Sequence, residues 1–409
     1  MKSIIFPVCC LLIAQFSIAQ SADALYKKGD SLYKVKEFEK SAIAYTSAIK
    51  KQGKEAEVDK YWTAAKSWSM ANVLDTAFNL LSIISNSERT SESDTKVIEN
   101  DKDFTVLRTD KRWNPLMDKM KARALSNYSF EELIYGRKDG VALTMLHLKP
   151  KSKSNGKAII RVVAGSWFSS YQQAERSIRP SSMYIERGYT IFLVVVASQP
   201  RYAIPDEIED VKRAVRYIRY NANKLKVDPD HIGIEGSSAG GHLSLAVATA
   251  DEKIDTASQD PVNHVSSRVQ AVTVLFPPTD FLNWGINDAS FVNLKDLQLI
   301  NAVYGAFDFR TWNNITRTYD HVSDTSARNK IAKEMSPINY ISSDDPPVFI
   351  IHGDADRTVP IQQSETFISR LKQAGVNNKF IIKKGGVHNP NDMMPELKQF
   401  VDWFDKYLK

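Results

Sequence analysis

Two nearly continuous runs of β-branched and other apolar residues constrain the fold of this chain more than any other feature. They are KAIIRVVAG at 157–165 and YTIFLVVVA at 189–197. Unbroken runs of this kind are typical of strands buried on both faces of a parallel sheet, whereas half-exposed strands alternate apolar and polar residues. Parallel strands need crossover connections, which are usually helices. The runs therefore predict an α/β fold.

The segments around these runs extend the pattern to the C-terminus. Two strands flank the turn 137–140, before the first buried run, and later strand-like segments are HIGIEG, VQAVTVLF, PPVFIIHG and NKFIIKKG. One intervening helical segment has an apolar face made by Ile208, Val211, Val215, Ile218, Ala222 and Leu225. The alternation predicts an open, mostly parallel sheet that begins with an antiparallel pair. In such sheets the chemistry occurs at the carboxyl ends of the strands.

Residues 22–86 have a different pattern, with helical spacing and almost no strand signal. One set of positions resembles a tetratricopeptide repeat, and a second set resembles it more loosely: Leu25, Gly29, Leu32, Ser41, Tyr45 and Ala48, then Tyr61, Ala65, Trp68, Ala77 and Leu81. Such a repeat is a pair of antiparallel helices. A capping helix is expected around 113–120. Two interpretations stay open: a surface that binds a protein partner, and a structural spacer or support for a lid.

The first nineteen residues have the features of an export signal. Lys2 precedes the apolar stretch 4–18, and Ser17 and Ala19 are small residues at a cleavage site. The stretch is too short to cross a membrane. Cleavage would remove both cysteines, Cys9 and Cys10, so the mature chain would have no disulfide and no thiol nucleophile. We expect a signal peptide at 1–19, a helical domain at 20–124 and a catalytic domain at 125–409, in the periplasm or secreted.

The segment GIEGSSAGGH at 233–242 contains the pattern Gly-x-Ser-x-Gly in one register, Gly236, Ser238 and Gly240. It follows a predicted strand and precedes a predicted helix, which is the context of a nucleophile elbow. Glycines two residues on either side of the serine remove side chains that would collide with the strand or the helix. Ser238 is therefore the candidate nucleophile, and Ser237 is its neighbour.

A serine nucleophile needs a base, and the base needs an acid that orients it. In this fold the partners follow the serine in the order acid, then histidine. The strand PVFIIHG ends at DADRTVP, which offers Asp354 and Asp356, and the next strand ends at GGVHNP, which offers His388. Both loops are expected at the same edge of the sheet.

Residues 128–409 resemble α/β-hydrolases of the carboxylesterase type, and most closely the bacterial acetyl-xylan and feruloyl esterase-like proteins related to the prolyl-oligopeptidase group. The resemblance rests on RAVRYIRYNANKLKVDPDHIGIEGSSAGGHLSL, SPINYISSDDPPVFIIHGDADRTVPIQQSE and GGVH. It implies Ser238 as nucleophile, Asp356 as acid and His388 as base. Asp354 would then bond the loop backbone as an Asx turn does.

The expected oxyanion hole departs from the pattern of the family. Where the family has His-Gly-Gly-Gly or His-Gly-Gly-Trp, this chain has VVAGSW. Because oxyanion donors are backbone N–H groups, Ser166 and Gly165 remain candidates beside Ala239, the residue after the nucleophile. Trp167 and Tyr202 are the candidate substrate contacts.

The connection 277–336 is long and contains Phe281, Trp284, Phe291 and Trp312. It forms either a cap over the site or an ordinary helical excursion. No nucleotide-binding glycine motif and no pair of histidines at ligand spacing is present, so no cofactor and no metal are expected. With a net charge of +6 and no long basic run, nothing calls for nucleic acid.

The sequence therefore predicts an α/β-hydrolase with an N-terminal all-α, tetratricopeptide-like domain. Its expected activity is that of an exported serine hydrolase acting on small acyl or acetyl esters, with acylated carbohydrate as one substrate class. Two alternatives remain. The first is a serine peptidase or acylaminoacyl hydrolase with the same triad. The second is an interaction protein whose repeats bind a partner and whose hydrolase domain is weak.

Overall fold

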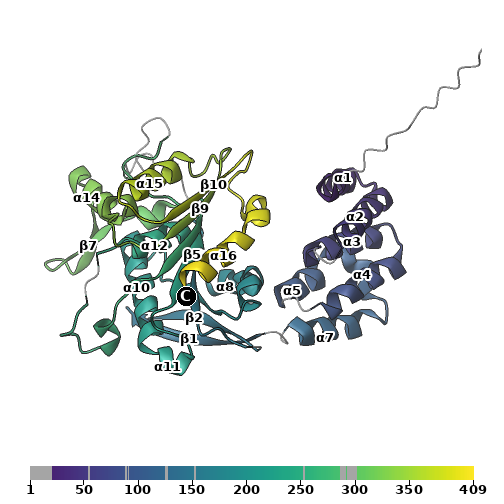
Figure 1. Cartoon of the computed structure of the whole chain (residues 1–409), viewed down its shortest axis with the longest axis horizontal. Helices are drawn as coiled ribbons and strands as arrows, with labels where there is room; N and C mark the ends of the chain where they lie inside the picture. The colour runs from purple at the N-terminus through teal and green to yellow at the C-terminus, as the bar shows by residue number, and fades with distance from the viewer. Residues whose placement is uncertain are drawn as a thin grey trace, which may run out of the picture. The chain divides into compact units, whose positions relative to one another are not determined.

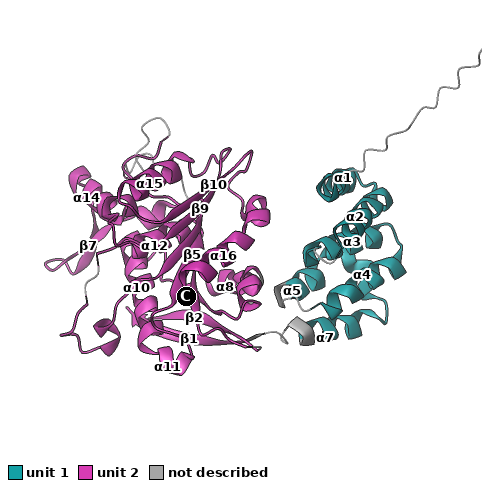
Figure 2. Cartoon of the chain, in the orientation of Figure 1, with its two compact units in different colours: residues 1–124 teal, residues 125–409 magenta. Residues whose placement is uncertain are grey.

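The chain divides into two compact units, Met1–Ala124 and Leu125–Lys409 (Figure 2). The computed structural model describes residues 21–409 except 54–55, 88–89, 91, 125–127, 152, 252–253, 286–291 and 293–301. The expected export signal at 1–19 lies outside the described residues. Among the described residues, no helix has both the length and the apolar character needed to cross a bilayer.

The first unit is helical. Its helices are α1 (Ala22–Lys34), α2 (Phe38–Gln52), α3 (Val58–Met70), α4 (Leu74–Asn86), α5 (Glu92–Asn100), α6 (Thr105–Arg108) and α7 (Trp113–Ala124). The first two cross closely at Gly29, where a Cβ would lie 2.9 Å from the ring of Tyr45. Met117 and Met120 of α7 are buried in the common core, so α7 occupies the place expected of a capping helix.

The second unit is built on an eight-stranded sheet in the order β1-β2-β4-β3-β5-β6-β9-β10. Figure 1 labels β1 and β2 at one side of this sheet and β9 and β10 at the other. The strands are β1 (Tyr128–Lys138), β2 (Val141–Pro150), β3 (Ala158–Val163), β4 (Thr190–Val195), β5 (Ile232–Ser237), β6 (Ala271–Leu275), β9 (Val348–Gly353) and β10 (Asn378–Lys383). β2 pairs antiparallel with both β1 and β4, and the other described pairs of this sheet are parallel. The predicted mostly parallel sheet, the leading antiparallel pair and the α/β-hydrolase fold class are confirmed.

Helices cover both faces of this sheet, and each face has its own core. The first core includes α10 (Ile204–Tyr220), α12 (Ala239–Ala248) and α15 (Gln362–Gln373), and the second includes α8 (Tyr171–Ser177), α9 (Ser182–Ile185) and α16 (Lys398–Tyr407). Besides short 3-10 helices, the described residues of this unit also form α11 (Ala222–Leu225), α14 (Thr325–Met335) and the hairpin β7 (Arg310–Asn313) and β8 (Thr318–His321). The apolar face predicted over 208–225 is thus divided between α10 and α11.

The strand order reverses between β3 and β5. β3 has β4 on one side and β5 on the other, so the connections that leave β3 and β5 diverge at this point. In an open α/β sheet such a switch point leaves a crevice at the carboxyl ends of the strands, and ligands bind there. The loop 164–170 and the turn at Ser238 both lie at this edge.

Candidate active site

Ser238 occupies the sharp turn between β5 and α12. It has φ +53° and ψ −123°, a backbone conformation that a non-glycine residue adopts only when its surroundings hold it there. Its N–H donates to the carbonyl of Leu275 at 2.9 Å, which ties the turn to β6. Ser237, by contrast, is the last residue of β5 and pairs with Leu275 in the sheet. The turn therefore presents Ser238 at its apex.

The two flanking glycines are required by the packing of this turn. A Cβ on Gly236 would lie 2.3 Å from the carbonyl oxygen of Gly240, and a Cβ on Gly240 would lie 2.4 Å from the carbonyl oxygen of Val162. Both obstacles are backbone atoms, which cannot move aside as a flexible side chain can. The glycine register inferred from the sequence thus has a direct steric cause.

His388 and Asp356 complete a hydrogen-bonded chain with the serine. Nε2 of His388 lies 2.9 Å from Oγ of Ser238, and its Nδ1 lies 2.7 Å from Oδ2 of Asp356. A carboxylate can only accept, so Nδ1 carries the proton and Nε2 is free to accept the proton of the serine hydroxyl. The three residues come from loops after β10, β9 and β5, at one edge of the sheet.

The carboxylate of Asp356 is fixed by several further donors. Its Oδ1 accepts from the N–H groups of Thr358 at 2.8 Å and Val359 at 3.0 Å, and Nε2 of His352 lies 3.3 Å from Oδ2. Burial by itself would raise the pKa of Asp356, but the hydrogen bonds from His352, His388 and the backbone of Val359 outweigh it and hold that pKa well below its usual range. Asp356 therefore stays ionised beside the imidazole.

Asp354 bonds loop backbone, as expected, but not in the form of an Asx turn. Its Oδ1 accepts from the N–H of Gly385 at 2.6 Å, so it joins the loop after β9 to the loop after β10. The Asx turn expected at Asp354 is instead made by Asp356, through the N–H of Thr358. The bond of Asp354 to the loop backbone is present, but it is a long-range contact between two loops.

The loop after β3 forms a tight two-residue turn. Gly165 and Phe168 exchange both backbone hydrogen bonds, at 3.0 Å and 2.9 Å, and the two residues between them have positive φ, +52° for Ser166 and +54° for Trp167. Turns with two positive φ values normally contain asparagine or glycine. A side chain in this conformation costs roughly 1–2 kcal/mol per residue. The sequence pattern gave no sign of this turn, because neither residue favours it.

The backbone donors around Ser238 differ in their availability. The N–H of Gly165 donates to Phe168, so this candidate donor already has an acceptor. The N–H groups of Ser166 and Ala239 have no acceptor among the described residues. The N–H of Gly240 donates to the carbonyl of Ala164 at 3.2 Å, which holds the loop after β3 against the start of α12. In the described part of the chain, Ser166 and Ala239 are thus the candidate donors whose N–H groups have no acceptor.

The two candidate substrate contacts lie in different environments. Trp167 is only 3% exposed, and its ring packs against Phe281 and Phe307 below the loop, so its side chain is part of the core. Tyr202 is 7% exposed and lines a cavity of about 360 Å³ at the carboxyl end of β4. The expectation that Trp167 faces the substrate conflicts with this burial.

Three residues that the sequence did not single out support the site. His242 accepts from the indole N–H of Trp167 at 3.1 Å, and burial lowers its pKa to about 4. Phe276 packs on His388 with a ring separation of 4.3 Å. His352 lies beside Asp356. The available signal for the two histidines was a single polar residue inside an otherwise apolar or small-residue segment, SAGGHLSL and PVFIIHG.

The long connection after β6 is partly described. Phe281 and Trp284 are buried in the first core, whereas Trp312 is 49% exposed on the β7–β8 hairpin. Phe291 lies outside the described residues. The described aromatic residues therefore belong to two environments, a packed base and an exposed hairpin.

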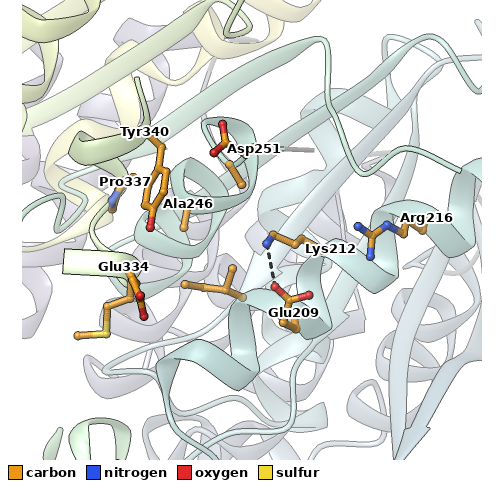
Figure 3. Close-up of a pocket in the computed structure, with 11 residues that line it drawn as sticks. Glu209, Lys212, Arg216, Ala246, Asp251, Glu334, Pro337 and Tyr340 are labelled. Carbon is orange, nitrogen blue, oxygen red and sulfur yellow. Dashed lines mark hydrogen bonds and ion pairs between the residues drawn. The ribbon is translucent and has the colours of Figure 1, made fainter. Parts of the chain in front are cut away.

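A second cavity, of about 350 Å³, lies away from the triad between α10, the end of α12 and residues 334–340 (Figure 3). Lys212 and Glu209 on its wall point toward each other and form an ion pair at 2.8 Å. Among the described residues, no group of three or more His, Cys, Asp or Glu side chains is arranged to hold a metal ion.

The fold and this edge of the sheet define the chain as an α/β-hydrolase. The model of the BD-FAE family matches residues 145–371, which is more than half of the chain, and the chain belongs to this family.

Individual proteins of known name are similar to this chain. The probable carboxylic ester hydrolase LipM of Mycobacterium tuberculosis is 30% identical over 215 residues, covering 53% of this chain and 44% of that protein. Esterase LipQ of the same organism is 28% identical over 240 residues, covering 59% and 51%. The chain thus spans about half the length of these curated relatives. The solved structure of a truncated carbohydrate esterase from gut microbiota is similar with a TM-score of 0.55 and 27% identity, covering 69% of this chain and 97% of that one.

Proposed function

We propose that this protein is a serine carboxylic ester hydrolase that uses Ser238, His388 and Asp356. The observation that carries the proposal is the continuous hydrogen-bonded chain from Asp356 through His388 to Oγ of Ser238. Serine becomes nucleophilic when an adjacent base takes its proton, and the base works best when a third group fixes its tautomer. The similarity to proteins named carboxylic ester hydrolase and esterase supports the same reaction.

In the proposed reaction, Oγ of Ser238 attacks the carbonyl carbon of the ester while Nε2 of His388 takes the hydroxyl proton. The carbonyl oxygen becomes an oxyanion, and in this proposal the N–H groups of Ser166 and Ala239 bind it. His388 then gives its proton to the leaving alcohol, and the acyl group remains on Ser238. Water, activated by the same imidazole, releases the acid.

For the substrate, we propose small acyl esters, with acetyl groups on carbohydrate as the favoured class. The support is the 27% identity to a solved carbohydrate esterase. A panel of acetylated and feruloylated oligosaccharides, assayed for release of acetate or ferulate, tests this choice. Hydrolysis of simple aryl acetates with no activity on any esterified saccharide would contradict the carbohydrate part alone.

The test of the reaction compares the purified chain with two single variants on p-nitrophenyl acetate. Ser238→Ala should lose hydrolysis and covalent labelling by a fluorophosphonate, whereas Ser237→Ala should keep most of both, because Ser237 ends β5 in the sheet. If Ser237→Ala is the inactive variant, the nucleophile is misassigned. An inactive wild-type chain would favour the interaction-protein alternative.

We also propose that the protein is exported and that cleavage follows Ala19. The support is the charged start, the short apolar stretch and the small residues at 17 and 19. N-terminal sequencing of the protein recovered from the periplasm or the medium tests this proposal. A retained Met1 in the mature protein would contradict it.

A further inference from the structure

The turn 165–168 must be held by contacts outside itself. Both of its central residues, Ser166 and Trp167, have positive φ, and neither is a residue type that prefers this conformation. Strained backbone of this kind persists only where the surrounding structure determines it. The N–H of Ser166 is the proposed oxyanion donor. Its position therefore depends on the contacts that hold the turn.

The strongest anchor of the turn is the indole of Trp167. It is 3% exposed, and its Nε1–H donates to Nδ1 of His242 at 3.1 Å. The rings of Phe281 and Phe307 surround it at centroid separations of 5.6 Å and 5.3 Å. The Ser166 carbonyl is held separately, by Nε2 of Gln199 at 2.6 Å. The Trp167 side chain, which follows the proposed donor Ser166, is thus fixed by a hydrogen bond as well as by packing.

His242 links this anchor to the nucleophile. It lies in the first turn of α12, and its backbone N–H donates to the carbonyl of Ser238 at 2.9 Å. Its Nε2 lies 2.8 Å from the carbonyl oxygen of Met335, which can only accept, so Nε2 carries the proton and Nδ1 accepts from Trp167. The neutral imidazole of His242 therefore joins the turn 165–168 to α12, the helix that begins after Ser238.

We propose that Trp167 and His242 are positioning residues that set the N–H of Ser166 relative to Ser238 and Ala239. The chain lacks the glycine run that would let this loop adopt positive φ without strain, and a buried side-chain anchor takes its place. The inference rests on the proposed function, because it concerns the oxyanion hole of that reaction. Both side chains are buried, so they are assigned a positioning role and not a contact with the substrate.

This arrangement predicts a particular kinetic signature. Oxyanion donors bind charge that develops in the transition state, so a displaced donor lowers kcat and leaves KM nearly unchanged. A general loss of packing would instead lower the fraction of folded enzyme, which active-site titration with a fluorophosphonate measures. The two causes are therefore separable.

The test is Trp167→Phe, which keeps an aromatic ring and removes the indole N–H. We expect kcat on p-nitrophenyl acetate, per titrated site, to fall about 10- to 100-fold, less than the full loss of a donor, with KM nearly unchanged. The matched control is Trp403→Phe, which removes a buried indole whose Nε1 lies 3.4 Å from the Pro347 carbonyl in the second core. The control should keep the wild-type kcat. A trifluoromethyl ketone forms an adduct with the serine that resembles the tetrahedral intermediate. Its affinity should fall in parallel with kcat in Trp167→Phe and stay at the wild-type value in Trp403→Phe.

A second pair of variants keeps the test decisive if Trp167→Phe folds poorly. His242→Gln retains one acceptor and one donor, whereas His242→Leu retains neither, so kcat should fall further in the leucine variant. Equal kcat in these two variants, or wild-type kcat in folded Trp167→Phe, would overturn the inference while the esterase function stands. An equal loss in Trp403→Phe would overturn it as well. An inactive wild-type chain would instead overturn the proposed function.

Discussion

Asp354 and Asp356 lie two residues apart in one loop, and their carboxylates have different partners. Oδ2 of Asp356 lies 2.7 Å from Nδ1 of His388, whereas Oδ1 of Asp354 accepts from the backbone N–H of Gly385 at 2.6 Å. Asp356 is buried and Asp354 is exposed. The same loop therefore supplies one carboxylate for the proposed chemistry and one that joins the loop after β9 to the loop after β10.

We predict that Asp356→Asn lowers kcat/KM on a small ester by about 1,000- to 10,000-fold, because an amide in place of the carboxylate no longer stabilises the imidazolium or its tautomer. Asp354→Asn is the matched control and should lose less than about tenfold, since an amide oxygen still accepts from Gly385. Both variants should be compared at equal folded fraction by steady-state kinetics. A larger loss in Asp354→Asn would reverse the assignment of the acid.

Much of the fold was predictable because it depends on local pattern. The buried runs at β3 and β4 and the strand–turn–helix around Ser238 follow from hydrophobic continuity and glycine spacing, and the structure has them at these positions. The order of serine, acid and histidine was also predictable, since each residue lies in the turn or loop that follows a strand.

The remaining features depend on contacts between distant segments. The turn at Ser166 and Trp167 has positive φ, and its contacts come from distant residues: His242, Phe281 and Phe307 around the indole and Gln199 on the Ser166 carbonyl. No local sequence signal encodes such contacts. For the same reason Trp167 looked like a substrate contact: an aromatic residue after a strand is equally suited to a pocket or to the core. The exposed β7–β8 hairpin had too few residues per strand for a periodic signal.

The strain at Ser166 makes a prediction for stability and activity together. Ser166→Gly keeps the backbone N–H and removes the side chain from a φ of +52°, so activity should be retained. The free energy of unfolding should rise by up to about 1 kcal/mol, the relief of strain less the greater freedom of glycine in the unfolded chain. Denaturant titration and ester kinetics measure both. A large loss of kcat in a folded Ser166→Gly would mean that the hydroxyl, not the N–H, acts in the site.

Asp210 predicts a dependence of stability on pH. The residue is 3% exposed, and burial raises its pKa to about 6 although Nζ of Lys138 lies 3.1 Å from Oδ1. Because this pKa exceeds the ordinary value of about 3.9, the folded state binds more protons between about pH 4 and 6. The contribution is therefore fully present below about pH 4 and is lost as the pH rises through 6, by roughly 3 kcal/mol at most.

Asp210→Asn should reduce the pH dependence of the free energy of unfolding between about pH 4 and 6. Denaturant titrations across that range measure the slope. The control is Glu209→Gln, whose side chain is 62% exposed. Glu207, which is fully buried, also has a raised pKa because of its burial, so some pH dependence at higher pH should remain in Asp210→Asn. An unchanged slope in Asp210→Asn would mean that Asp210 titrates normally in the folded protein.

Esters should be hydrolysed far better than peptide amides. The amine leaving group of an amide must be protonated before it departs, which demands accurate general-acid geometry and firm placement of the chain on both sides of the scissile bond. Large peptidases with this triad commonly add a β-propeller that holds the peptide. In the described part of residues 21–124, by contrast, the chain forms helices and no strand.

The turn 165–168, which contains the proposed oxyanion donor Ser166, also favours ester hydrolysis. It is held by the buried Trp167, with the Gln199 amide on the Ser166 carbonyl, and this argues for a fixed acyl site suited to small groups. The decisive measurement is kcat/KM for an acetyl ester against matched aminoacyl and prolyl anilides, with Ser238→Ala as the background control. Equal or better cleavage of the anilides would contradict the esterase assignment and favour the peptidase alternative. The same serine would then be cleaving amides, whose leaving group is the more difficult one to expel.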